Sequence, residues 1–378
     1  MTNQMTDRSG QAWERLVELM AAIEQDWWRE IRQMPNPDDR AEARMFALNA
    51  LHHALEFWSQ ADPERPWFYR WFSPTKKLLG DNPDAVYYGT VIHPDRDYVI
   101  RGNLAGAVYT SFTVEQGTVG GSMSTGLGAT LNDDEIQVHP DGSYELHVSQ
   151  KPQPGNWLAL KPDSGSITTR HYFEWDRPAA TDPTLHVPLS IQPVPHPGPP
   201  TIPDDESCAQ SLERVATFLR SVTVDWPAGR PENVPEWSSI EPNRFTNPPL
   251  DAGNRAIGYA AADNAYRSTR YQLTPDQALE IRGRFPQCRF ANVVLNNRFI
   301  QTPPYRHRRV SLNRRQTTLE ADGSFRMILA HRDPGVPNWL DTAGAPTGTV
   351  FWRYLLPTEQ PEQLQTQVLP IDEVRATR

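Results

Sequence analysis

Hydrophobic positions in the first sixty residues recur at three- and four-residue spacing, which is typical of half-buried helices. Two prolines in "MPNPDDR" separate two such stripes, and Asp38 or Asp39 is suited to cap the second helix. The pattern predicts a helical segment over residues 1–80 whose apolar stripes pack against another domain. The stripe positions are Trp13, Leu16, Val17, Met20, Ile23, Trp27 and Ile31, then Phe46, Leu48, Leu51, Leu55 and Trp58.

From about Asp81 the pattern changes to short β-branched and aromatic runs bounded by Gly, Pro and Asp, which predicts antiparallel strands. Asp141-Gly142 is typical of a hairpin turn, because Gly readily adopts a positive φ. We therefore expect a β-sandwich-like domain over residues 81–180. The predicted strands are "AVYYGTVI", "DYVIRG", "AVYTSFTV", "EIQVH", "SYELHVS" and "ITTRHYFEW".

Residues 181–250 are rich in proline and predict an extended linker, interrupted by one short helix at "ESCAQSLERVATFLRSV". The prolines argue against most strand pairing in the first part of this linker. A second β region follows over residues 251–360, and residues 361–378 form a C-terminal tail.

The second β region repeats the first. "HPDRDYVIRGNLAG" at 93–106 matches "TPDQALEIRGRFPQ" at 274–287, an offset of 181 residues, and "PDGSYEL" matches "ADGSFRM" at the same offset. "GNWL" then matches "PNWL", and "TRHYF" matches "WRYLL", in the same order and at nearly the same offset. A tandem duplication of one β domain explains this series. The expected fold is mainly β, with two tandem antiparallel sandwich-like domains and an N-terminal helical segment.

Composition excludes several classes of protein. The 378 residues carry a formal net charge of −9, which argues against nucleic acid or an anionic membrane surface as a partner. Two cysteines are too few for a disulfide framework. Because we find no signal-peptide pattern and no apolar run long enough to span a membrane, we expect a soluble, cytoplasmic protein.

The duplication also sorts candidate functional residues. Features kept in both copies, such as Arg170 with Arg353 and the two Asn-Trp pairs, are expected mainly to serve the fold. A glycine-rich stretch, "GTVGGSMSTGLGATLNDDEI", occurs only in the first copy. We interpret it as a flexible surface loop or as a lid over a ligand cavity. The second copy has the basic cluster "YRHRRVSLNRR" there, interpreted as a solvated charged loop or as a segment that binds an acidic ligand or the acidic partner repeat.

His171 is the titratable residue of greatest interest, because Tyr354 replaces it in the second copy. Strand alternation places His171 on one face, and Arg170 and Tyr172 on the other. A hydrogen-bonded core histidine and a general acid or base in a cavity are the two interpretations. The predicted catalytic residues are His171, Arg170 and Tyr88. The predicted substrate-binding residues are Tyr87, Asp84, Arg101, Ser124, Thr125 and Trp157.

We predict no cofactor and no metal site. The chain has no Cys-x-x-Cys pair, no His-x-x-x-His motif and no dinucleotide or phosphate-binding fingerprint. The scattered histidines His93, His139, His147 and His171 could converge on a metal only through the fold.

Several of these phrases together resemble a known family. "NPDAVYYGTVI", "DYVIRGN", "STGLGATLNDDEI", "DGSYEL", "GNWLAL" and "TRHYFEWDR" are similar to bacterial proteins that carry the domain of unknown function (DUF) 1214. The resemblance covers roughly residues 40–180, with weaker repeats from about 255 to 357. It implies a β-sandwich-like domain and brings no established reaction, cofactor or catalytic residue.

Three functions are consistent with this pattern. The first is an enzyme (a hydrolase, lyase or isomerase) that uses cofactor-independent acid–base chemistry on a small, largely apolar molecule at the domain junction. The second is a non-catalytic module that binds a small molecule or a carbohydrate. The third is a scaffold or a homo-oligomer subunit, in which Trp27 and Trp28 pack against a second chain.

Overall fold

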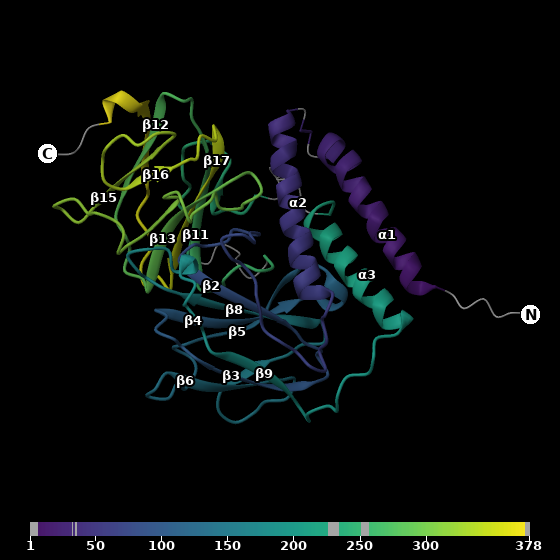
Figure 1. Cartoon of the computed structure of the whole chain (residues 1–378). Coiled ribbons are helices and arrows are strands. Elements are labelled where there is room, and N and C mark those ends of the chain that lie inside the picture. Colours follow the sequence, from purple (N-terminus) through teal and green to yellow (C-terminus); the bar gives the residue numbers. More distant parts are fainter. Residues whose placement is uncertain (1–6, 32, 35, 226–233, 251–256, 375–378) are drawn as a thin grey trace, which may run out of the picture.

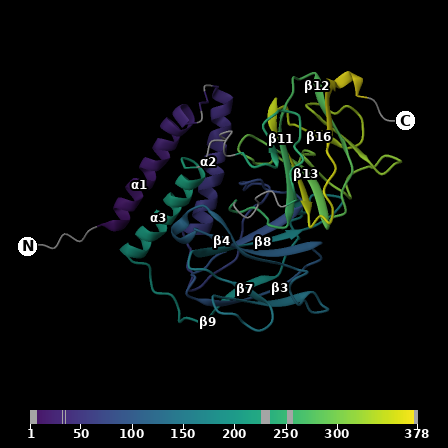
Figure 2. The same cartoon turned by 180° about the vertical axis from the view of Figure 1, so that it is seen from behind.

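A computed structural model describes residues 7–374, apart from residues 32, 35, 226–233 and 251–256. Two β-sandwiches and a layer of helices make up this part of the chain (Figure 1). The second sandwich stands on one sheet of the first, and the helices lie beside the junction of the two, as the view from behind also shows (Figure 2).

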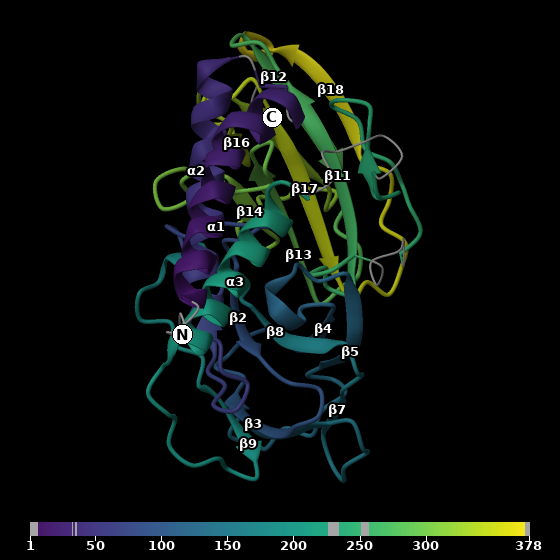
Figure 3. The same cartoon turned by 90° about the vertical axis from the view of Figure 1, so that its right-hand side faces the viewer.

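Three α-helices form the helical layer, α1 (Arg8–Ala22), α2 (Pro37–Trp58) and α3 (Asp205–Val222), and α3 packs against both others (Figure 3). The α3 helix is the one predicted within the linker. The cap of α2 is Asn36, whose side chain accepts a hydrogen bond from the Asp38 backbone, because Pro37 occupies the first helical position. The prediction of Asp38 or Asp39 as the cap is therefore wrong, because the cap lies two residues before Asp38.

A π-helix continues α1 over Ile23–Ile31. Trp27 and Trp28 are both buried there, with 0% and 3% exposure, and Trp27 packs against Phe46 and Phe299. These two side chains are therefore core residues and do not form a surface for a second chain. The wider π turn allows two neighbouring side chains to face the core.

The predicted apolar stripes of the helices are buried only in part. Leu16, Ile23 and Phe46 lie in the core, whereas Trp13 is 60% exposed and Leu48 is 57% exposed. The expectation that whole stripes pack against another domain is therefore wrong for their outer positions.

The first sandwich consists of a five-stranded sheet in the order β1-β2-β8-β4-β5 and a four-stranded sheet in the order β7-β6-β3-β9. Ile100, Phe112, Leu146 and Ile167 fill the space between the sheets. Its strands are β1 (Tyr69–Arg70), β2 (Ala85–Val91), β3 (Asp97–Asn103), β4 (Tyr109–Gln116), β5 (Gly126–Asn132), β6 (Ser143–Ser149), β7 (Trp157–Ala159), β8 (Ser164–Tyr172) and β9 (Leu189–Val194).

The second sandwich repeats this order strand for strand, as β10-β11-β17-β13-β14 and β16-β15-β12-β18. The common order confirms the duplication and the mainly β fold predicted from the sequence. Its strands are β10 (Ser238–Ser239), β11 (Asn264–Gln272), β12 (Gln277–Gly283), β13 (Phe290–Asn296), β14 (Ser311–Asn313), β15 (Phe325–Ala330), β16 (Trp339–Asp341), β17 (Thr347–Leu355) and β18 (Gln365–Pro370).

Two strands come from segments that we interpreted as linker and tail. β9 lies within residues 181–250 and pairs with β3, and β18 lies within residues 361–378 and pairs with β12. Both are edge strands, where the missing N–H of proline costs no ladder hydrogen bond. Conversely, the predicted strand "EIQVH" is not a strand, although the hairpin turn at Gly142 has the expected positive φ of 83°.

The repeated Asn-Trp phrase serves the fold in both sandwiches. The Asn156 amide donates to the carbonyls of Gln137 and Glu145 and accepts from the Gln137 N–H. Asn338 makes the same three bonds with Thr318 and Arg326. Asn156 thereby links the segment at Gln137 to β6, and Asn338 links the segment at Thr318 to β15.

Buried polar contacts join the two sandwiches. Asp84 accepts hydrogen bonds from Asn292 at 2.9 Å and from Asn313 at 3.1 Å. The Tyr109 hydroxyl donates to Asp263 at 2.6 Å. Arg314, from the basic cluster of the second copy, pairs with Glu174 of the first copy at 2.7 Å. The alternative that this cluster binds the partner repeat is therefore confirmed for Arg314.

Candidate functional site

A cavity of about 610 Å³ lies where the two sandwiches meet the helices. Strands β2 and β8 of the first sandwich, β11 and β17 of the second, and helix α2 all contribute side chains to its wall. Domain junctions are common places for ligand sites, and this volume suits a small organic molecule.

The wall of the cavity shows the duplication directly. Tyr87 of β2 lies opposite Arg170 of β8, and Tyr266 of β11 lies opposite Arg353 of β17, in the same register. All four side chains line the one cavity. The duplication therefore brings two equivalent Tyr–Arg pairs into a single site.

Most of the remaining wall is aromatic. Trp237, Tyr266 and Phe351 form a triad with ring centroids 5.3–5.4 Å apart. Trp71 and Phe72 add rings from the segment after α2, with centroids 5.8 Å apart. Such a wall favours a ligand with a large apolar part.

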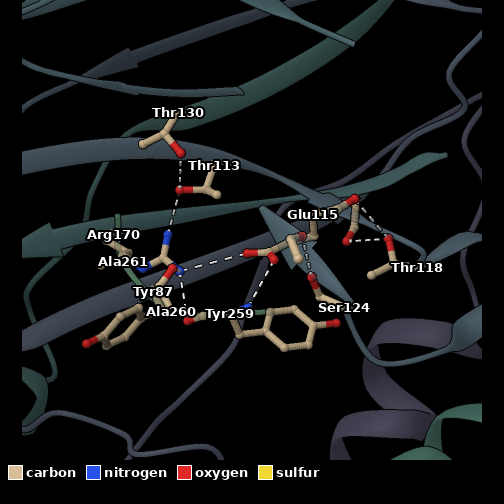
Figure 4. A network of polar contacts seen from close by, with 12 residues as sticks. Tyr87, Thr113, Glu115, Thr118, Ser124, Thr130, Arg170, Tyr259, Ala260 and Ala261 are labelled. Atoms are coloured by element: carbon tan, nitrogen blue, oxygen red, sulfur yellow. Dashed lines mark hydrogen bonds and ion pairs between the residues drawn. The ribbon is translucent and has the colours of Figure 1, made fainter. Parts of the chain in front are cut away.

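Arg170 is fully engaged by protein groups (Figure 4). Its guanidinium lies 3.8 Å from the Glu115 carboxylate and donates to the Thr113 hydroxyl at 2.8 Å. It also donates to the backbone carbonyls of Tyr259 and Ala260. Burial raises the pKa of Glu115, and the charge of Arg170 acts in the opposite direction.

Arg353 has a different environment. It is 5% exposed, its guanidinium carbon lies 4.5 Å from the centre of the Phe351 ring, and its Nη2 donates to the Gly80 carbonyl at 2.5 Å. Among the described residues, no carboxylate lies within ion-pair distance of it, and its Nη1 has no hydrogen-bond partner.

Tyr87, Tyr259 and Tyr266 of the cavity wall are held protonated. Burial raises the pKa values of Tyr87 and Tyr259 well above the usual range, and raises that of Tyr266. The charges of both arginines act in the opposite direction on Tyr87 and Tyr266. At neutral pH these phenols can donate hydrogen bonds to a ligand but cannot act as bases.

The glycine-rich stretch of the first copy contributes Met123, Ser124 and Thr125 to the cavity. Its second half is strand β5, so the expectation of a flexible loop is wrong for that part. The first half is fixed on α3, where the Met123 N–H donates to Ser221 and a Cβ at Gly121 would meet the Arg214 carbonyl at 2.5 Å.

Tyr87, Arg170, Ser124 and Thr125 are thus the predicted site residues that the structure brings together. His171 lies on the opposite face of β8, fully buried, between the hydroxyls of Thr110 and Thr169. Burial lowers its pKa to about 3, so the imidazole is neutral. It is therefore a hydrogen-bonded core histidine away from the cavity.

The other predicted site residues also lie elsewhere. Tyr88 packs against His171 with ring centroids 5.9 Å apart. Asp84 is buried between the sandwiches, and Arg101 forms an exposed ion pair with Glu145. Trp157 donates its indole N–H to Ser149 at the edge of a sheet. None of these four residues lines the described wall of the cavity.

Four residues that line the cavity were not predicted from the sequence: Trp71, Trp237, Tyr266 and Arg353. A signal for the last two existed, because both are the second-copy counterparts of Tyr87 and Arg170. We expected the paired arginines mainly to serve the fold and named only Arg170 as a candidate, because pairing alone does not show that the two copies share one cavity.

Within the described ranges, no cluster of three or more His, Cys, Asp or Glu side chains is arranged to hold a metal ion. No helix in the same ranges is long and apolar enough to cross a membrane.

Comparisons with known proteins agree with this architecture. A putative uncharacterized protein from Burkholderia cenocepacia has a similar structure, with a TM-score of 0.82 and 27% identity over 97% of this chain and 98% of that one. The VPA0106 protein from Vibrio parahaemolyticus matches with a TM-score of 0.49 and 12% identity, over 86% of this chain and 98% of that one, which is too distant to support an argument. No curated protein matches.

The model of one family matches the chain twice, at residues 93–173 and 259–359. These two segments fall in the two sandwiches and confirm both the resemblance and the duplication. Both sandwiches of this chain belong to the family described as "Protein of unknown function (DUF1214)".

Proposed function

We propose that this protein binds a small, largely apolar molecule in the cavity between its two sandwiches. The observation that carries the proposal is the wall itself, a cavity of about 610 Å³ with many aromatic rings and a few convergent polar groups. This combination is typical of small-molecule sites, in which apolar surface supplies affinity and the polar groups fix orientation.

The lining favours binding over acid–base catalysis. Among the described residues that line the cavity, none is Asp, Glu or His, so the wall offers no carboxylate or imidazole as a base. The second candidate function is catalysis in which Tyr87 or Tyr266 donates a proton or a hydrogen bond to an oxygen of the bound molecule. It is supported by the position of both phenols opposite arginines.

Native mass spectrometry of the purified protein, followed by titration with the neutral dye N-phenyl-1-naphthylamine, tests the proposal. We expect a small molecule that co-purifies with the protein or, in its absence, saturable enhancement of dye fluorescence with one site per chain. Chemical conversion of the co-purified molecule over time would support the catalytic alternative. A protein that carries nothing and leaves the dye unchanged would contradict both.

A further inference from the structure

Asn296 of β13 occupies the place that Glu115 holds in β4. In the first sandwich, Ser111 lies opposite Arg170, and Glu115 follows four residues later opposite Ser166. In the second sandwich, Asn292 lies opposite Arg353, and Asn296 follows four residues later opposite Thr349. The carboxylate that pairs with Arg170 is therefore replaced, beside Arg353, by an uncharged amide.

The hydroxyl partner of Arg170 is replaced as well. Thr113, which accepts a hydrogen bond from Arg170, corresponds in register to Val294. Asn296 is 1% exposed, and within the described residues neither atom of its amide group has a hydrogen-bond partner. Two equivalent arginines thus line one cavity, but protein groups neutralise only the first.

Other charged groups near the cavity are already paired. Arg298 lines the wall and forms ion pairs with Asp39 at 2.7 Å and with Glu42 at 3.1 Å. Asp81 forms no ion pair with Arg353: burial raises the pKa of this carboxyl, the charge of Lys77 opposes that rise more strongly than the charge of Arg353 does, and its two oxygens accept hydrogen bonds from the Thr302 N–H and hydroxyl. A buried arginine without a counter-ion is costly unless a ligand supplies the charge.

From this asymmetry, and on the basis of the binding function proposed above, we infer that the ligand is an apolar carboxylic acid whose carboxylate is held by Arg353. One uncompensated cation in the described wall matches one negative charge. The planar guanidinium matches a carboxylate, and the aromatic triad beside Arg353 accommodates the apolar part. Arg170, by contrast, is paired with Glu115 and hydrogen-bonded to protein groups, so its role is structural.

The test compares 2-naphthoic acid with 2-naphthamide, which has the same shape and no charge, by isothermal titration with the full chain. We expect the acid to bind about 10- to 100-fold more tightly, as for a hydrogen bond to a charged group. Arg353→Met should remove this preference and retain binding of the amide. The exposed Arg332, paired with Asp372, provides the control Arg332→Met, which should leave the preference unchanged.

Asn296→Glu provides a second test that retains the arginine. It restores the counter-ion present in the first copy, so it should abolish the preference for the acid without loss of amide binding. Equal affinity of the wild-type protein for acid and amide would overturn the inference while leaving the binding function in place. Failure of both compounds to bind would contradict the proposed function itself.

Discussion

Asp84 of the first sandwich and Asn292 of the second form a hydrogen bond of 2.9 Å, and both side chains are fully buried. Burial is the main reason why the pKa of Asp84 rises to about 6, and the hydrogen bonds from Asn292, Asn313 and Gln316 only partly offset it. The junction between the sandwiches therefore depends on an aspartate that titrates near neutral pH.

The first prediction concerns this titration. A carboxyl whose pKa is raised on folding stabilises the native state below its unfolded pKa, and that contribution is lost as the pH rises through about 6. Relative to Asp84→Asn, which does not titrate, the wild-type protein should lose roughly 3 kcal/mol of unfolding free energy between pH 3.8 and pH 7. Urea unfolding of both proteins at a series of pH values across this range measures the loss. The same pH dependence of the unfolding free energy in both proteins would contradict the prediction.

His171 should show the opposite dependence. Its folded pKa of about 3 lies below the unfolded value, so the native state binds fewer protons and loses stability as the pH falls from 6.5 towards 3. His171→Gln should weaken this loss, seen as a smaller decline of the melting temperature in acid, and should leave ligand binding unchanged. A binding defect at neutral pH in a folded His171→Gln protein would show that His171 acts in the site.

The pair of Glu115 and Arg170 should be structural. Glu115→Ala leaves a fully buried guanidinium without its counter-ion, which we expect to cost about 3–5 kcal/mol of unfolding free energy. The exposed pair of Arg101 and Glu145 provides the control, because Glu145→Ala should cost at most about 1 kcal/mol. Similar costs for the two variants in denaturant titrations would refute the structural role.

The Asn-Trp phrase should affect stability alone. Asn338→Ala and Asn156→Ala each remove three hydrogen bonds, and we expect losses of about 2–4 kcal/mol. The loss should be larger for Asn338, because Asn338 is buried and Asn156 is only half-buried. Thermal melts measure both. Unchanged stability combined with weakened ligand binding would show that the Asn-Trp phrase acts in ligand binding and not in the fold.

The sequence predicts the fold well where the pattern is local. Alternation correctly placed Arg170 and His171 on opposite faces of β8, and the internal repeat identified the second sandwich. It did not find β9, because the prolines around this edge strand argued against strand pairing, or β18, because its segment was interpreted as a tail. It also could not show that Trp27 and Trp28 are both buried, since this depends on a π-helical turn.

The candidate site was harder to predict because it is assembled from both copies. Tyr87, Ser124 and Thr125 emerged as candidates from the first copy alone. Arg353 and Tyr266 can be identified as site residues only from the fold, in which the two sheets meet at one cavity. The difference between the arginines lies in Glu115 and Asn296, which are remote from them in sequence and adjacent in the sheets.

Filling the cavity tests the central claim most directly. Thr168 of β8 lines the cavity at the position equivalent to Phe351 of β17, so Thr168→Phe places in the first copy the ring that the second already carries. We predict that titration with N-phenyl-1-naphthylamine shows saturable binding to the wild-type protein and at least about tenfold weaker binding to a folded Thr168→Phe protein. Equal dye binding by the two proteins would contradict a ligand site between the sandwiches.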